Sequence, residues 1–122
     1  MGAFNPNIPI YIQLENSIKQ DIAAGRLTPG SKLPSVRELA EAKTVNLNTV
    51  QRAYQELERE GVTETRRGTG TYVVETPDLV AGLRTQLAQA MISTFVGGMR
   101  ELGLSNKEIS GMLETHMNKE KR

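Results

Sequence analysis

The sequence of 122 residues predicts a mostly α-helical protein with one small β-hairpin. Two observations support this fold class. Up to Val74 the chain consists of short patterned segments separated by Gly and Pro, whereas from Leu79 it continues as long apolar-striped helix. After Gly61, helical spacing gives way to segments rich in β-branched residues. We place a boundary at the Pro77 turn, so that residues 1–76 and 77–122 are expected as separate parts.

Capping signals bound the first two helices. The first is expected from Pro9, which suits a first helical turn, to Gly25, which suits a C-terminal cap. The second is expected from Ser35, which matches a capping box with Glu38 three residues later, to about Lys43.

A third helix is expected from Asn46, a good N-cap, to Glu60. Its apolar residues fall on one side and five polar ones on the other: Asn48, Gln51, Arg52, Gln55 and Arg59. Residues 62–65 and 71–75 are expected as two strands joined by a Gly-containing loop, residues 66–70. Two helices with a short connection, followed by a hairpin, predict a winged helix-turn-helix.

This arrangement indicates DNA binding. The second helix of such a pair enters the major groove, where Asn48 and Gln51 can present a donor and an acceptor together to adenine. Asn46 and Thr49 are short and polar, which suits contact with a base or a phosphate group.

Four arginines complete the predicted DNA interface. Arg37 and Arg52 can neutralise phosphate groups, and Arg66 with Arg67 on the tight loop can reach a minor groove. Each feature alone has a plainer interpretation: a polar helix face is usually only solvated, and two loop arginines are often an ordinary exposed pair. The alternative for the whole unit is a protein–protein interaction adaptor that does not bind DNA.

Three segments in register carry a specific resemblance: GSKLPSVRELA (30–40), NLNTVQRAYQELE (46–58) and RGTGTYV (67–73). Together they resemble the GntR family of bacterial transcriptional regulators. The resemblance implies a homodimer that binds a palindromic operator. It also implies DNA contacts at Ser35, Arg37, Asn46, Asn48, Thr49, Gln51, Arg67 and Gly68. The sequence departs from the family at Lys43-Thr44, where an apolar residue and Gly are expected, and at Leu47, where Pro is common.

Residues 77–122 predict two helices with a wide apolar stripe, which two helices alone cannot bury. We expect a homodimer interface there, with packing onto the winged-helix part as the alternative. The expected dimerisation residues are Leu83, Leu87, Met91, Phe95, Met99, Ile109 and Leu113. This short tail resembles the YtrA subfamily, which implies repression of operons that often encode transporters. The methionines suit either core packing, which we favour, or a small apolar effector.

Composition excludes several other classes of protein. With no Cys and one His, a disulfide framework, a metal site and a nucleophilic enzyme are not expected, and neither is a cofactor. No apolar run approaches the roughly 20 residues of a membrane span, so we expect a cytoplasmic protein. The net charge of +1 averages basic and acidic surfaces, and implies modest non-specific affinity for DNA.

Overall fold

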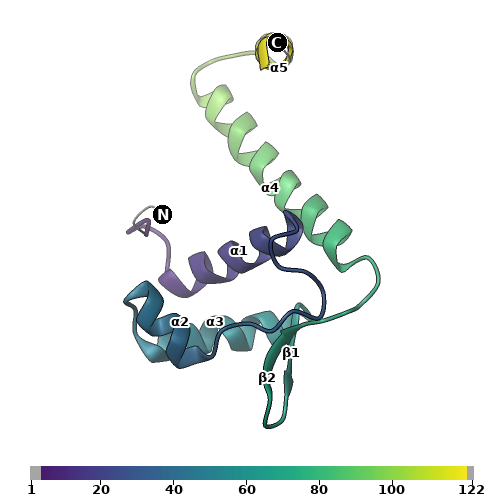
Figure 1. The fold of residues 1–122 in the computed structure, drawn as a ribbon. Helices are drawn as coiled ribbons and strands as arrows, with labels where there is room; N and C mark the ends of the chain where they lie inside the picture. Colours follow the sequence, from purple (N-terminus) through teal and green to yellow (C-terminus); the bar gives the residue numbers. More distant parts are fainter. Residues whose placement is uncertain (1–3, 121–122) are drawn as a thin grey trace. The chain divides into compact units, whose positions relative to one another are not determined.

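A computed structural model describes residues 4–120 and divides the chain into two compact units, up to Thr85 and from Gln86 onward. Five helices and two strands follow the expected order (Figure 1): α1 Ile10–Ala23, α2 Val36–Lys43, α3 Leu47–Arg59, β1 Thr63–Arg66, β2 Gly70–Val73, α4 Leu79–Glu101 and α5 Asn106–Glu120.

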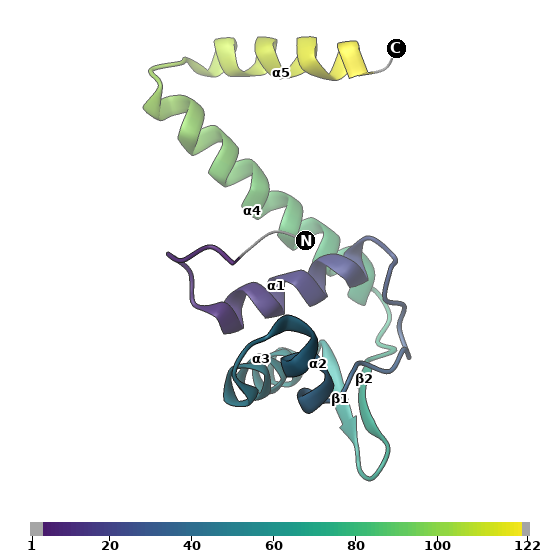
Figure 2. The same cartoon turned by 60° about the vertical axis from the view of Figure 1, so that its left-hand side comes forward.

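The core of the first unit lies where α1 packs against α3. Both views show α1 lying across α2 and α3, with the hairpin projecting away from the helices (Figures 1 and 2). Ile22 of α1 and Val50 and Leu57 of α3 are completely buried there. Since full burial of one such side chain contributes about 1.5–3 kcal/mol, this apolar contact fixes the orientation of α3.

The capping box predicted at the start of α2 is confirmed. The backbone N–H of Glu38 donates to Ser35 Oγ (3.0 Å), and the Ser35 N–H donates to Glu38 Oε1 (2.8 Å). The hydrogen bond from the Ser35 backbone is the main reason that the pKa of Glu38 lies below its ordinary value. The capping box therefore fixes where α2 begins, at the position from which Ser35 and Arg37 are predicted to contact DNA.

The connection from α2 to α3 contains an unusual residue. Thr44, the C-cap of α2, adopts the left-handed conformation (φ 56°), which β-branched residues rarely adopt. Its N–H donates to the carbonyl of Glu41 and the Val45 N–H to that of Ala40, the bonding pattern of a Schellman motif. The α2–α3 turn therefore has a common helix-ending geometry, with Thr44 at the left-handed position that glycine adopts at the lowest energetic cost.

The hairpin differs from expectation by one or two residues at each end. Antiparallel pairing runs from Thr63↔Val73 to Arg66↔Gly70, so only residues 67–69 form the loop. Arg66 therefore belongs to β1 and not to the loop, because Gly70, at φ 132°, already pairs with it. Both strands also stop short of the expected outer ends at residues 62 and 75.

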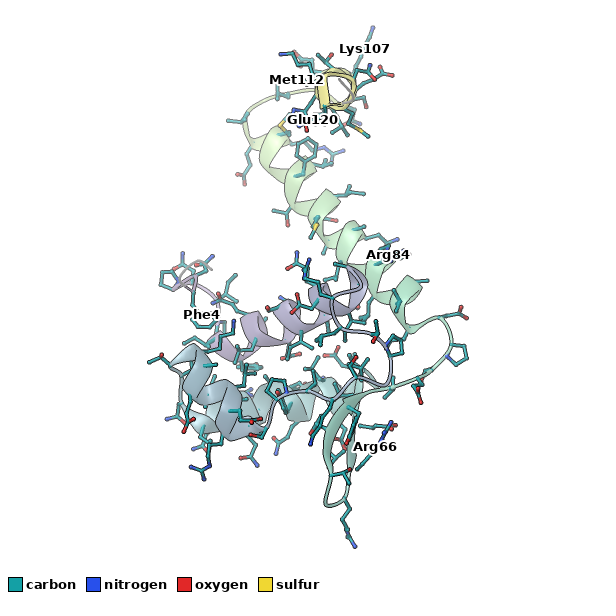
Figure 3. All side chains as sticks on the ribbon, in the orientation of Figure 1. Phe4, Arg66, Arg84, Lys107, Met112 and Glu120 are labelled. Atoms are coloured by element: carbon teal, nitrogen blue, oxygen red, sulfur yellow. The ribbon has the colours of Figure 1, made fainter. Side chains whose placement is uncertain are left out.

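The division between the two units falls within α4. Leu83 is buried in the first unit, and the Arg84 guanidinium donates to the Ala23 carbonyl at the end of α1 (3.0 Å; Figure 3). In the second unit, Ser105 and Glu108 form the expected capping box at the start of α5. None of the helices in the described part, residues 4–120, is long and apolar enough to cross a membrane.

Candidate DNA interface

The first turns of α3 present a mostly free polar surface. Asn48 and Gln51 are exposed, and Thr49 is half-buried. Asn46 has a local role as well, because its side-chain oxygen accepts the Asn48 N–H at 2.7 Å. An N-cap that accepts a backbone bond still has its amide N–H₂ free to donate.

The start of α2 contributes two of the predicted contact residues. Ser35 and Arg37 are both exposed. The Ser35 hydroxyl accepts the capping hydrogen bond, but it retains its own proton to donate to a phosphate oxygen. Within residues 4–120 no ion pair involves Arg37, so its charge is available to an external anion.

Two of the predicted DNA-contact arginines are engaged within the protein. The Cζ atom of Arg52 lies 3.9 Å from the ring centroid of Tyr11 in α1. That of Arg66 lies 4.0 Å from the centroid of Tyr72, and Arg66 Nε lies 3.0 Å from Glu64 Oε2. Such contacts hold a guanidinium in place, and the Glu64 carboxylate also offsets the charge of Arg66.

The sequence interpretation assigned neither tyrosine to the DNA interface. Tyr72 faces Glu64 across the hairpin, so that it lies on the same face of the sheet as Arg66. This neighbour depends on the strand register, which the sequence pattern placed only approximately. The Tyr11–Arg52 contact joins two helices far apart in the chain, and nothing in the local pattern indicated it.

The wing tip is exposed to solvent. Arg67 and Gly68 are exposed, and Gly68 has φ 78°. The Thr69 N–H donates to the Arg66 carbonyl (2.9 Å), which closes the loop tightly. Within the described residues Arg67 makes no ion pair, unlike Arg66, which Figure 3 shows on the hairpin. Arg67 is therefore the free cation of the tip.

A shallow open depression of about 660 Å³ lies between α3 and the hairpin. Its lining includes Gln51, Gln55 and Glu58, of which the sequence interpretation had assigned only Gln51 to DNA. Glu58 accepts a hydrogen bond from Thr65 of β1 (2.6 Å), and this bond fixes the hairpin against α3.

Tyr54 of α3 links this helix to the segment just before α2. Its hydroxyl donates to the Pro34 carbonyl (2.7 Å), and burial raises the pKa of Tyr54 to about 12. The bond ties α3 to the residue before the α2 cap. The two elements that carry the predicted contacts are thus held in a fixed relation.

Comparison with known proteins identifies the unit. Residues 10–73 match the model of the bacterial regulatory proteins of the gntR family. The chain belongs to the GntR family. It is 43% identical over 112 residues to the Bacillus subtilis HTH-type transcriptional regulator YhcF, covering 92% of this chain and 93% of that one. It is 46% identical over 97 residues, 75% of each chain, to the B. subtilis HTH-type transcriptional repressor YtrA. A GntR family regulator structure from Listeria monocytogenes superposes with a TM-score of 0.83, at 37% identity, over 92% of this chain and 98% of that one.

GntR membership makes the first unit the DNA-binding winged helix of a transcriptional regulator, and such regulators are not enzymes. The predicted fold class and family are therefore confirmed. Within residues 4–120 no group of three or more His, Cys, Asp or Glu residues could hold a metal ion.

The expected dimerisation residues fall into two groups. Leu83 and Ile109 are buried within the chain itself. The other five are exposed or half-exposed: Leu87, Met91, Phe95, Met99 and Leu113. Packing inside a single chain does not cover Met91, Met112 and Met117, because each is more than half exposed. The preference for core packing over an effector stays a prediction.

Proposed function

We propose that this regulator is a cytoplasmic homodimeric repressor that binds a palindromic operator, with α3 in the major groove and the wing in the minor groove. The observation that carries the proposal is the exposed polar start of α3, held by Tyr54 beside the capped start of α2. A relative that is 46% identical is named a repressor, which supports the sign of regulation. The resemblance to the YtrA subfamily points to a transporter-type operon.

In this proposal different side chains read bases and hold phosphates. Asn48, Thr49 and Gln51 read base edges, since they lie at the start of α3 and two of them can pair bidentately with adenine. Asn46 and Ser35 contact phosphate groups beside the two helix N-termini, where backbone N–H groups favour anions.

The four arginines fall into two groups, according to whether they make contacts within the protein. Arg37 and Arg67 are exposed and unpaired among the described residues, so they contact phosphate and minor groove directly, with Gly68 letting the backbone approach closely. Arg52 and Arg66 reach the DNA backbone from their tyrosine platforms. A guanidinium stacked on a ring keeps its N–H donors pointing outward around its edge.

The dimer uses the exposed apolar side chains of α4 and α5. Phe95 and Leu113 are about 40% exposed and Met91 more than half exposed. A second copy of the chain would cover these side chains with the same surface of its own. A palindromic operator requires such a two-fold dimer. Methionine side chains on this surface adapt readily, which also suits a small apolar effector. Sedimentation tests the dimer: a monomer at micromolar concentration would rule it out.

Binding measurements on two duplexes test the assigned roles. One duplex is enriched from a randomised library by the protein itself, and the other has mixed sequence. Gln51→Ala is expected to cost about 1–3 kcal/mol on the enriched duplex and little on the other, because it removes a base contact. Arg37→Ala is expected to weaken both and to flatten the salt slope by about one unit.

The matched control is Gln89→Ala, the same exchange at an exposed position of α4 in the second unit, which should change neither affinity. Equal losses from Gln51→Ala on both duplexes would contradict its base-reading role. A wild-type affinity that does not change with salt would instead favour a protein–protein adaptor.

A further inference from the structure

Lys32 lies in the segment between the α1 turn and α2, outside every helix and named strand. It forms an antiparallel bridge with Tyr72 of β2, and the next N–H, that of Leu33, donates to the Thr71 carbonyl (2.8 Å). The segment around Lys32 therefore pairs with β2 and extends the wing sheet by a short third segment. Lys32, Tyr72 and Gly70 share one face of it, because residues two apart on a strand point the same way.

The side chain of Lys32 runs across Gly70. A Cβ added at Gly70 would lie 2.7 Å from Lys32 Cε and 3.6 Å from its Nζ. A real Cβ contact is essentially never that short, so a side chain at position 70 would force the end of the flexible Lys32 side chain to move from this place. The Lys32 side chain therefore lies over the first residue of β2, at the neck of the wing.

The Lys32 charge also acts on the start of α2. It contributes, after the larger effect of the hydrogen bonds from Ser35, to the low pKa of Glu38. No ion pair to Lys32 is formed within residues 4–120, and the residue is exposed. An unpaired cation thus lies between two elements that are proposed to touch the same DNA backbone.

We infer that Lys32 is a phosphate-binding residue of this interface, and that Gly70 is the residue that positions it. The ligand is a backbone phosphate group of duplex DNA, between the phosphates held at the α2 start and the groove entered by the wing. A lysine acts there as a point charge and reads no sequence. The inference rests on the proposed DNA-binding mode and adds a contact that the local sequence pattern did not reveal.

The salt dependence of affinity tests the contact. Wild type, Lys32→Met and Lys32→Arg are titrated on a mixed-sequence duplex between 50 and 200 mM salt. Lys32→Met keeps most of the stem but removes the charge. It is expected to reduce the slope of log K against log salt by about 0.9 for each phosphate group that is no longer neutralised, and Lys32→Arg to restore it. Lys107→Met, at an exposed position of α5 in the second unit (Figure 3), is the matched charge control and should leave the slope unchanged.

An unchanged slope for Lys32→Met, beside a steep wild-type slope, would overturn the inference and leave the proposed function intact. A wild-type slope near zero would instead overturn the proposed function itself. A loss of thermal stability in Lys32→Met with no change in slope would assign Lys32 to bracing the wing, which also overturns the inference.

A double-mutant comparison tests the part played by Gly70. Gly70→Ala is expected to displace the lysine and flatten the slope, but to add nothing to the slope change in the Lys32→Met background. Gly61→Ala is the matched control, since Gly61 also has positive φ (79°) but nothing lies within 4 Å of an added Cβ. Additive effects of Gly70→Ala and Lys32→Met would show that Gly70 acts through the hairpin backbone and not through Lys32.

Discussion

Replacing Thr44 by Gly is expected to stabilise the protein, although it removes a side chain. A left-handed conformation costs an L-residue about 1–2 kcal/mol, and Thr44 adopts it at φ 56°. Glycine avoids that cost but loses about 0.5–1 kcal/mol more through its freedom in the unfolded chain. The backbone hydrogen bonds of Thr44 and Val45 need no side chain and should remain. The expected net gain is about 0.5–1 kcal/mol.

Thermal unfolding at fixed protein concentration measures this gain. For a unit of this size, about 1 kcal/mol corresponds to a Tm shift of about 4–8 °C. Thr85→Gly is the matched control, because Thr85 is exposed on the helical backbone of α4 and glycine there should cost a few tenths of a kcal/mol, on the order of the propensity difference. If both exchanges lower the Tm, the reasoning about backbone strain at Thr44 is wrong.

Three further exchanges test the packing of the first unit. Tyr54→Phe should cost about 1–3 kcal/mol by leaving the Pro34 carbonyl without its donor, and should abolish the tyrosine absorbance change near pH 12. Thr63→Val should raise the Tm, because among residues 4–120 the buried Thr63 hydroxyl has no hydrogen-bond partner and Val has nearly the same shape; a lower Tm would refute this. Burial is the main cause that raises the pKa of Glu15 above 4.5, and the negative charge of Glu60 is the next. The ionised form of Glu15 therefore opposes folding at neutral pH. Glu15→Gln should therefore be more stable than wild type at pH 7, and denaturant titrations should show this difference shrinking as the pH falls through the raised pKa and vanishing below 4.5; a constant difference would contradict the shift.

The fold could be predicted from the sequence because its signals are local. The capping pair Ser35 and Glu38 fixes the start of α2, and apolar spacing fixes which face of α3 is buried. The predicted hairpin ends were wrong by one or two residues, since Gly70 pairs at φ 132° where a loop residue was expected. The residue pattern alone does not show whether a glycine beside a turn belongs to the loop or to the first pair of the strand.

The interface was predictable in its residue types but not in its internal contacts. Exposed Asn48 and Gln51 follow from helical spacing. The stacking of Arg52 on Tyr11 and the passage of Lys32 over Gly70 depend on segments that meet only in the folded chain. Such long-range neighbours carry no signature in the local sequence, and they decide which cations are free.

Selection of duplexes from a fully randomised library by the wild-type protein tests the central claim most directly. We predict enrichment of an inverted repeat whose half-site centres lie about 10 base pairs apart, or a multiple of that, because each α3 of a two-fold dimer reads one major-groove face. Enrichment of a motif without two-fold symmetry, or no enrichment at all, would contradict a dimeric regulator that reads its operator through α3.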